Sequence, residues 1–264
     1  MAGLPIWYEL MTADLAAAGA FYRATLGWEV PPQGEAMPGG VQYAQIGRAD
    51  GTSAGGVLTL SRAMQDCGAR TRWIPYFHVE DVDASVAAAE GLAAKVQMPP
   101  VSMDGVGRMA MLADPQGAPF YLMAPTPPAG QPEAKSEAFD PFKAGHCRWN
   151  ELNTTDGAGA LAFYEALLGW TAGMKMPMGA AGDYQFLEHA GIAIGAINPV
   201  QEGPSHWLPI FGVANIEAAR AAATETGGKV TVDLQEIPGG EFALNVDDPG
   251  GAALGFVGPK GASQ

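Results

Sequence analysis

The chain has 264 residues, of which 48% are hydrophobic and 16% charged, and its formal net charge is −14. This composition favours a well-filled core over extended disorder, and the negative charge argues against a nucleic-acid partner. Two cysteines do not make a disulfide framework, the first residues lack the pattern of a signal peptide, and no apolar run of about 18 residues exists. We therefore expect a cytoplasmic protein with no membrane partner.

The first sixty residues predict a strand, a helix and then further strands. Residues 5–12 (PIWYELMT) alternate partly and carry aromatic side chains, which is typical of a strand. Asp14 then stands where a helix N-cap belongs, and Gly27 supplies the left-handed stop after LAAAGAFYRATL. Residues 41–48 predict another strand, and residues 53–61 predict one or two more.

The same pattern starts again within this half of the chain. Residues 73–80 (WIPYFHVE) predict a strand, and Asp81 opens a helix over DVDASVAAAEGL. Three further strands are expected at 95–101, 109–113 and 119–124, with the turn DPQG before the last. The first half therefore consists of two consecutive βαβββ modules.

The second half of the chain repeats the first. Residues 7–28 match residues 149–170 at 14 of 22 positions, including FY and LGW. Later in each copy, WIPYF becomes WLPIF and DPQG becomes DPGG. A repeat of this length indicates duplication of a whole domain, so the chain should hold four βαβββ modules.

The boundaries of the two copies follow from composition. We expect one domain at 4–125 and a second at 145–259, joined by a linker at 126–144 that is rich in Pro, Ala and charged residues. The expected oligomeric state is a monomer or a homodimer.

These motifs resemble those of a known group of proteins. A strand ending in T-x-D, a helix with A-x-F-Y-x-x-x-L-G-W and a late D-P-x-G turn are similar to the vicinal oxygen chelate superfamily. That superfamily includes glyoxalase I, bleomycin-resistance proteins and extradiol dioxygenases. The resemblance implies an α+β fold of two tandem glyoxalase-like domains. In each, paired βαβββ units form a curved eight-stranded sheet, a cup, with helices outside.

The resemblance also locates the metal ligands of the superfamily, and this chain departs from them. The corresponding positions hold Trp7, Ile74 and Tyr121 in the first copy, and Trp149, Leu208 and Gly255 in the second. Divalent transition metals need several oxygen, nitrogen or sulfur donors that converge. We therefore expect neither the superfamily's metal nor another cofactor, although a displaced ion near Glu9, His78 and Asp104 remains an alternative.

Strand alternation predicts which side chains line the cups. The expected ligand-binding residues are Trp7, Glu9, Met11, Ile74, Tyr76, His78, Tyr121, Trp149, Glu151, Asn153 and Leu208. Glu9 and Glu151 are carboxylates among aromatic rings, so each needs hydrogen bonds or a raised pKa. Three readings stay open for them: a structural hydrogen bond, recognition of a ligand, or a general base.

The most direct functional hypothesis is binding of a small apolar or aromatic molecule in the cups, without the superfamily's metal. One alternative is a metal-independent isomerase, lyase or hydrolase acting on a small carbonyl compound, with Glu9, His78 and Tyr121 as catalytic candidates. Others are a metal-dependent glyoxalase or dioxygenase with a displaced site, and an interaction protein whose cups are filled by side chains. The Gly-rich segments 31–40 and 172–183 are either lids or ordinary loops.

Overall fold

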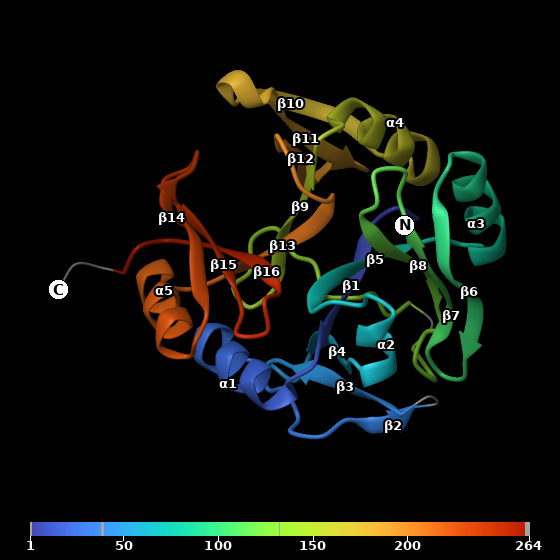
Figure 1. The fold of residues 1–264 in the computed structure, drawn as a ribbon, viewed down its shortest axis with the longest axis horizontal. Coiled ribbons are helices and arrows are strands. Elements are labelled where there is room, and N and C mark those ends of the chain that lie inside the picture. The colour runs from blue at the N-terminus through green and yellow to red at the C-terminus, as the bar shows by residue number, and fades with distance from the viewer. Residues whose placement is uncertain (1, 38–39, 132, 262–264) are drawn as a thin grey trace. The chain divides into compact units, whose positions relative to one another are not determined.

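The computed structural model describes residues 2–37, 40–131 and 133–261. Four βαβββ modules follow one another along this part of the chain (Figure 1). Module 1 consists of β1 (Pro5–Thr12), α1 (Leu15–Leu26), β2 (Glu35–Met37), β3 (Val41–Gly47) and β4 (Ser53–Thr59), and is followed by the short helix α2 (Arg62–Asp66). Module 2 consists of β5 (Arg72–His78), α3 (Val82–Gly91), β6 (Lys95–Met103), β7 (Gly107–Ala113) and β8 (Pro119–Pro125).

Modules 3 and 4 repeat this order. Module 3 consists of β9 (Cys147–Thr154), α4 (Gly157–Leu168), β10 (Thr171–Pro177), the 3₁₀ turn Gly179–Ala181, β11 (Asp183–His189) and β12 (Ile192–Pro199). Module 4 consists of β13 (His206–Gly212), α5 (Ile216–Glu225), β14 (Lys229–Glu236), β15 (Phe242–Asp247) and β16 (Ala253–Gly258). The prediction of four βαβββ modules is confirmed.

The strands form two eight-stranded mixed sheets, one for each copy. Their orders are β2-β3-β4-β1-β5-β8-β7-β6 and β10-β11-β12-β9-β13-β16-β15-β14. Within a module the first strand pairs parallel with the last, as β9 does with β12, and the remaining neighbours pair antiparallel. The helix is the crossover that a parallel pair requires. The predicted α+β fold of two glyoxalase-like sheets is therefore confirmed.

The helix boundaries follow from capping residues that the repeat carries twice. The Asp14 side chain accepts a hydrogen bond from the Ala17 amide at the start of α1, and Asp156 does the same for Gly159 at the start of α4. Each helix ends at a glycine in the left-handed region, where φ is 68° at Gly27 and 69° at Gly169. A side chain at these positions would be strained, which is why glycine ends both helices.

The chain divides into two compact units, and each unit takes one module from each copy. Unit 1 comprises residues 1–6, 74–136 and 149–208, and unit 2 comprises residues 7–73, 137–148 and 209–264. Unit 1 therefore joins modules 2 and 3, with α3 against α4, while unit 2 joins modules 1 and 4, with α1 against α5 (Figure 1). Helix packing thus runs between the copies.

The core of unit 2 explains several of the repeated motifs. The Tyr22 hydroxyl, on α1, donates a 2.9 Å hydrogen bond to Asp248 Oδ2, from the DPGG turn of the other copy. It accepts a 2.9 Å bond from Trp73 Nε1. The rings of Trp28 and Phe211 meet edge to face at 4.8 Å, a favourable geometry for aromatic pairs. The FY, LGW, W-x-P and D-P-x-G motifs therefore build one buried aromatic cluster.

Unit 1 contains the matching cluster with the copies exchanged. The Tyr164 hydroxyl donates to Asp114 Oδ2 at 3.0 Å and accepts from Trp207 Nε1 at 3.3 Å. Trp170 stacks on Tyr164 with ring centroids 4.9 Å apart. Burial raises the pKa of both hydroxyls and both aspartates, because the charged forms lose hydration in an apolar core.

Two segments differ from the predicted loops. The first half of 172–183 belongs to the edge strand β10, which pairs antiparallel with β11 and leaves Met174 68% exposed. Within 31–40, residues 35–37 form β2, and residues 38 and 39 lie outside the described part of the chain. The loop prediction was wrong for these strands because glycine and methionine weaken the strand signal while the neighbouring strand supplies the hydrogen bonds.

The end of the segment expected as a linker is part of unit 2. Ala138 is buried, and Arg48 donates hydrogen bonds to the carbonyls of Glu137 and Ser53. Across the described residues, every helix is too short or too polar to cross a membrane.

Candidate functional site

Strand β9 presents three polar or aromatic side chains on one face. Trp149, Glu151 and Asn153 alternate along the strand, so they point to the same side of the sheet. The next strands of module 3 add Tyr184 and Phe186 from β11 and Asn198 from β12. We call these six residues of unit 1 the β9 patch.

A chain of hydrogen bonds connects the rings of the β9 patch to its carboxyl group. Trp149 Nε1 donates to the Tyr184 hydroxyl at 2.9 Å, and this hydroxyl donates to Glu151 Oε2 at 2.9 Å. The polar atoms of both rings are thereby used within the patch. Both rings are only partly buried.

Two amide side chains, Asn198 and Asn153, extend this hydrogen-bond network. Asn198 Nδ2 donates to Asn153 Oδ1 at 2.8 Å and to Glu151 Oε1 at 3.3 Å. Asn153 is 6% exposed, and its own Nδ2 is buried without a hydrogen-bond partner. Buried donors are almost always paired in native proteins, so this amide calls for an explanation.

The electrostatics of the patch favour an uncharged carboxyl group. Burial raises the pKa of Glu151, and the hydrogen bonds from Tyr184 and Asn198, together with the nearby Asn153 amide, oppose this shift only in part. Burial and the neighbouring Glu151 charge also raise the pKa of Tyr184. Removal from water disfavours each ionised form, and two adjacent acids disfavour ionisation of each other.

Three partly buried rings of the patch contact one another, and one of them, Tyr184, bonds to this carboxyl group. Phe186 meets Trp149 edge to face at 5.4 Å and 72°, and meets Tyr184 at 5.6 Å and 77°. Rings held in such contacts are rigid platforms that lose little entropy when a flat molecule stacks on them.

The first copy carries the same frame with a different polar content. Trp7 Nε1 donates to the Tyr43 hydroxyl at 3.0 Å, and Glu9 is buried at 3% exposure. Burial, and then the Glu9 charge, raise the pKa of Tyr43. The Tyr43 ring lies over Gly56, where an added Cβ would overlap the Tyr43 hydroxyl group.

The strand registers show where the copies diverge. Asn198 pairs with Asn153 between β12 and β9, whereas the corresponding pair between β4 and β1 is Leu58 with Met11. The indole, phenol and carboxyl groups are therefore common to both copies, and the amide pair belongs to the second copy alone.

The other predicted site residues lie on β5, β8 and β13. Tyr76 and Tyr121 stack in parallel, with ring centroids 4.0 Å apart and planes inclined by 11°. His78 ends β5, and its Nδ1 is buried without a hydrogen-bond partner. Ile74 is fully buried and Leu208 is 5% exposed.

The donor set does not fit the metal centre of the superfamily. Trp, Ile, Leu and Gly at the corresponding positions offer no side-chain donor for a divalent ion, and Tyr121 is a single phenol. In the described part of the chain, no group of three or more His, Cys, Asp or Glu side chains could hold a metal ion.

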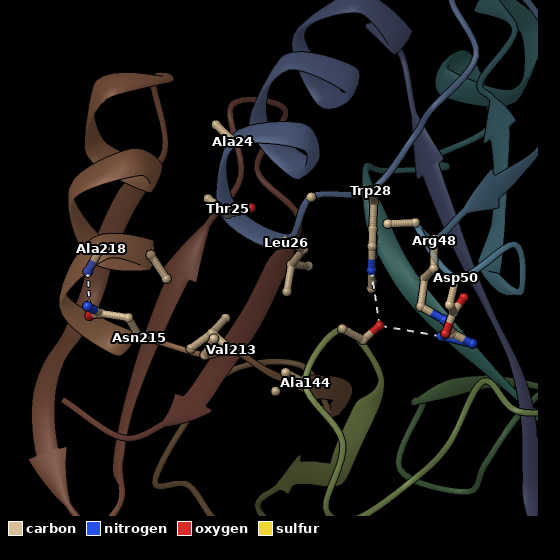
Figure 2. Close-up of a pocket in the computed structure, with 16 residues that line it drawn as sticks. Ala24, Thr25, Leu26, Trp28, Arg48, Asp50, Ala144, Val213, Asn215 and Ala218 are labelled. Atoms are coloured by element: carbon tan, nitrogen blue, oxygen red, sulfur yellow. Dashed lines mark hydrogen bonds between the residues drawn. The ribbon is translucent and has the colours of Figure 1, made fainter. Parts of the chain in front are cut away.

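A pocket of about 500 Å³ lies elsewhere, in unit 2, between the end of α1 and the start of α5 (Figure 2). The Gly145 carbonyl accepts hydrogen bonds from Trp28 Nε1 at 3.0 Å and from Arg48 at 3.4 Å. The Arg48 guanidinium is otherwise held by Thr52 and by backbone carbonyls. These polar groups bind the segment before β9 to module 1, which is a structural role.

Sequence reasoning missed Tyr43, Tyr184, Phe186 and Asn198. Tyr43 lies 36 residues after Trp7, and Tyr184 lies 35 residues after Trp149. A search that allowed a one-residue gap in the repeat would have aligned the two tyrosines.

The comparisons with known proteins agree with this architecture. Residues 7–123 match the family model described as "Glyoxalase-like domain", and residues 143–256 match the model of the "Glyoxalase/Bleomycin resistance protein/Dioxygenase superfamily". The chain belongs to this superfamily.

Relatives cover almost the whole chain. The protein named "Putative glyoxylase CFP32" of Mycobacterium bovis is 31% identical over 260 residues, which is 97% of this chain and 95% of that protein. The "Anthracycline biosynthesis protein DnrV" of Streptomyces peucetius is 30% identical over 276 residues, covering 97% of this chain and 93% of the relative.

Solved structures share the fold at low sequence identity. The Mn(II)-bound glyoxalase from Novosphingobium aromaticivorans has a TM-score of 0.64 and 16% identity, over 97% of this chain and 82% of that one. The 2,3-dioxygenase LapB from Pseudomonas sp. KL28 has a TM-score of 0.63 and 14% identity, over 100% of this chain and 94% of that one.

Proposed function

We propose that this protein binds a small aromatic molecule on the β9 patch, without the metal ion used by metal-dependent members of its superfamily. The observation that carries the proposal is a set of three partly buried rings, Trp149, Tyr184 and Phe186, which contact one another and connect to the buried Glu151 through the Tyr184 hydroxyl. Partly buried rings that are held in place by such contacts are suited to stacking on a flat ligand.

Two further observations support binding of an organic molecule. The positions that hold metal ligands in the superfamily carry Trp149 and Leu208 in the second copy. In addition, several relatives are named for anthracycline biosynthesis or as glyoxylases, and such names imply small organic compounds. In this function the residues of the β9 patch bind and orient a ligand.

Calorimetric titration with 2-ethylnaphthalene and 2-acetylnaphthalene tests the proposal. Trp149→Leu should weaken both probes by about tenfold, because the main stacking face is lost. Phe142→Leu is a matched control, since Phe142 is 84% exposed and lies outside the patch. If neither probe binds, or if Trp149→Leu binds both as the wild type does, the proposed function is wrong.

Incubation of the protein with 2-acetylnaphthalene tests the alternative of metal-independent turnover. The buried, unpartnered Nδ1 of His78 is the observation that favours it. Chromatography of the ketone after prolonged incubation should return it unchanged. A product that forms with the wild type and is lost in His78→Gln would replace binding with catalysis.

A further inference from the structure

Asn153 Nδ2 is a buried donor of the β9 patch that lacks a hydrogen-bond partner. The Oδ1 of the same side chain accepts from Asn198. Its Nδ2 carries two hydrogens and makes no hydrogen bond of good geometry, although it lies near enough to Glu151 to lower the pKa of that carboxyl group. Asn198 uses both of its own amide hydrogens, on Glu151 and on Asn153. Asn153 Nδ2 can therefore donate a hydrogen bond to a ligand. A ligand atom that accepts hydrogen bonds would satisfy this buried donor.

Comparison of the two copies indicates that this donor is not needed for folding. Met11 and Leu58 fill the same paired positions in the first copy, around the same indole, phenol and carboxyl frame. An apolar pair is thus compatible with this strand register. A buried amide with an unmade bond is destabilising by comparison, whereas an acceptor from a ligand would offset that loss.

We propose that the β9 patch binds an uncharged aromatic carbonyl compound, whose oxygen accepts a hydrogen bond from Asn153 Nδ2 while its ring stacks on Trp149. This inference rests on the proposed function and adds the class of ligand and the residue that selects it. A carboxylate ligand fits less well, because it would approach the Glu151 carboxyl group. Asn198, which donates to Asn153, and Tyr184 are only partly buried, so this side of the patch is the one that a ligand would approach.

The test compares two probes that differ at one group, 2-acetylnaphthalene with its carbonyl and 2-ethylnaphthalene without it. The wild type should prefer the ketone by about threefold to tenfold, as one net hydrogen bond predicts. Bound ketone should also show its C=O stretching band at lower wavenumber in the infrared. A band shift reports the hydrogen bond itself, independently of affinity.

Three variants assign that bond to Asn153. Asn153→Met with Asn198→Leu recreates the pair of the first copy and should remove both the preference and the band shift while the hydrocarbon still binds. Asn153→Asp replaces the amide donor with an acceptor and should also remove both. Asn245→Leu, an asparagine of β15 outside the patch, should change neither.

Separate results distinguish this inference from the proposed function. If both probes bind equally, or if the band shift survives in both Asn153 variants, carbonyl recognition by Asn153 is wrong while aromatic binding stands. If neither probe binds to the wild type, the proposed function fails first. Circular dichroism and thermal unfolding confirm that each variant is folded, and Asn153→Met with Asn198→Leu should be at least as stable as the wild type.

Discussion

Glu151 shows how one buried side chain can serve two purposes. Its oxygens accept hydrogen bonds from Tyr184 and Asn198, which satisfies the group, yet burial still raises its pKa. A neutral carboxyl group next to Asn153 is compatible with an uncharged ligand, and an ionised one repels anions. The same residue therefore stabilises the patch and restricts what it accepts.

The pKa of Glu151 leads to a prediction about stability and pH. Because the folded-state pKa lies above the ordinary value near 4.5, the folded protein holds this proton more tightly than the unfolded chain does. The contribution is fully present below pH 4.5 and is lost as pH rises through the folded-state value. Glu151→Gln removes the titrating carboxyl group. As pH rises from 4.5 through the folded-state pKa, the free energy of unfolding of the wild type should therefore fall relative to that of the variant.

Urea unfolding of both proteins between pH 4 and pH 8 measures the difference. Subtraction cancels the other buried acids, such as Asp114 and Asp248, whose pKa values are also raised. A wild-type stability that stays parallel to that of Glu151→Gln at all pH values would contradict a raised pKa.

At the scale of elements, local signals predicted most boundaries. Asp14, Asp81 and Gly27 act as the caps that the sequence indicated, because capping depends on a few adjacent residues. Strand alternation predicted that Trp149, Glu151 and Asn153 share a face. The partners of these residues could not be predicted, since Tyr184 and Asn198 reach them through a register across three strands that includes an irregularity at Leu187 and Glu188.

Two helix-end glycines give a matched prediction at this scale. Gly27→Ala forces a Cβ into the left-handed region and should destabilise the fold by about 1 kcal/mol, with no steric clash because no atom lies within 4 Å of an added Cβ. Gly91→Ala is the control. Gly91 ends α3 without a positive φ, so alanine should stabilise by about 0.5 kcal/mol. Equal effects in chemical denaturation would contradict the assignment of the Gly27 cap.

At the scale of the whole molecule, the compact units are defined by which modules pack together and not by the order of the two copies along the chain. Sequence comparison revealed two copies, and the compact units each combine halves of both. No local pattern encodes this exchange, because the hydrogen bond from Tyr22 to Asp248 joins residues 226 positions apart. The repeated motifs could be seen in the sequence, but their partners could not.

This exchange predicts how the separated copies behave. Fragments 1–135 and 136–264 each leave an aromatic cluster without its aspartate, so neither should unfold cooperatively as a monomer. Coexpressed, they should associate one to one and recover the tryptophan fluorescence of the intact chain. Light scattering after size exclusion measures the association, and a stable monomeric fragment with a native spectrum would show that the copies fold independently.

The pairing of Tyr22 with Asp248 and of Tyr164 with Asp114 also constrains how such a gene can evolve. If recombination replaces one half with that of a homologue, each of these two hydrogen bonds then joins a residue of the introduced half to a residue of the original half. Substitutions in the aromatic clusters of the two halves must therefore be mutually compatible, so the two halves are expected to evolve together at these positions. The side chains on the sheet faces, such as Asn153 and Asn198, can diverge independently in each copy.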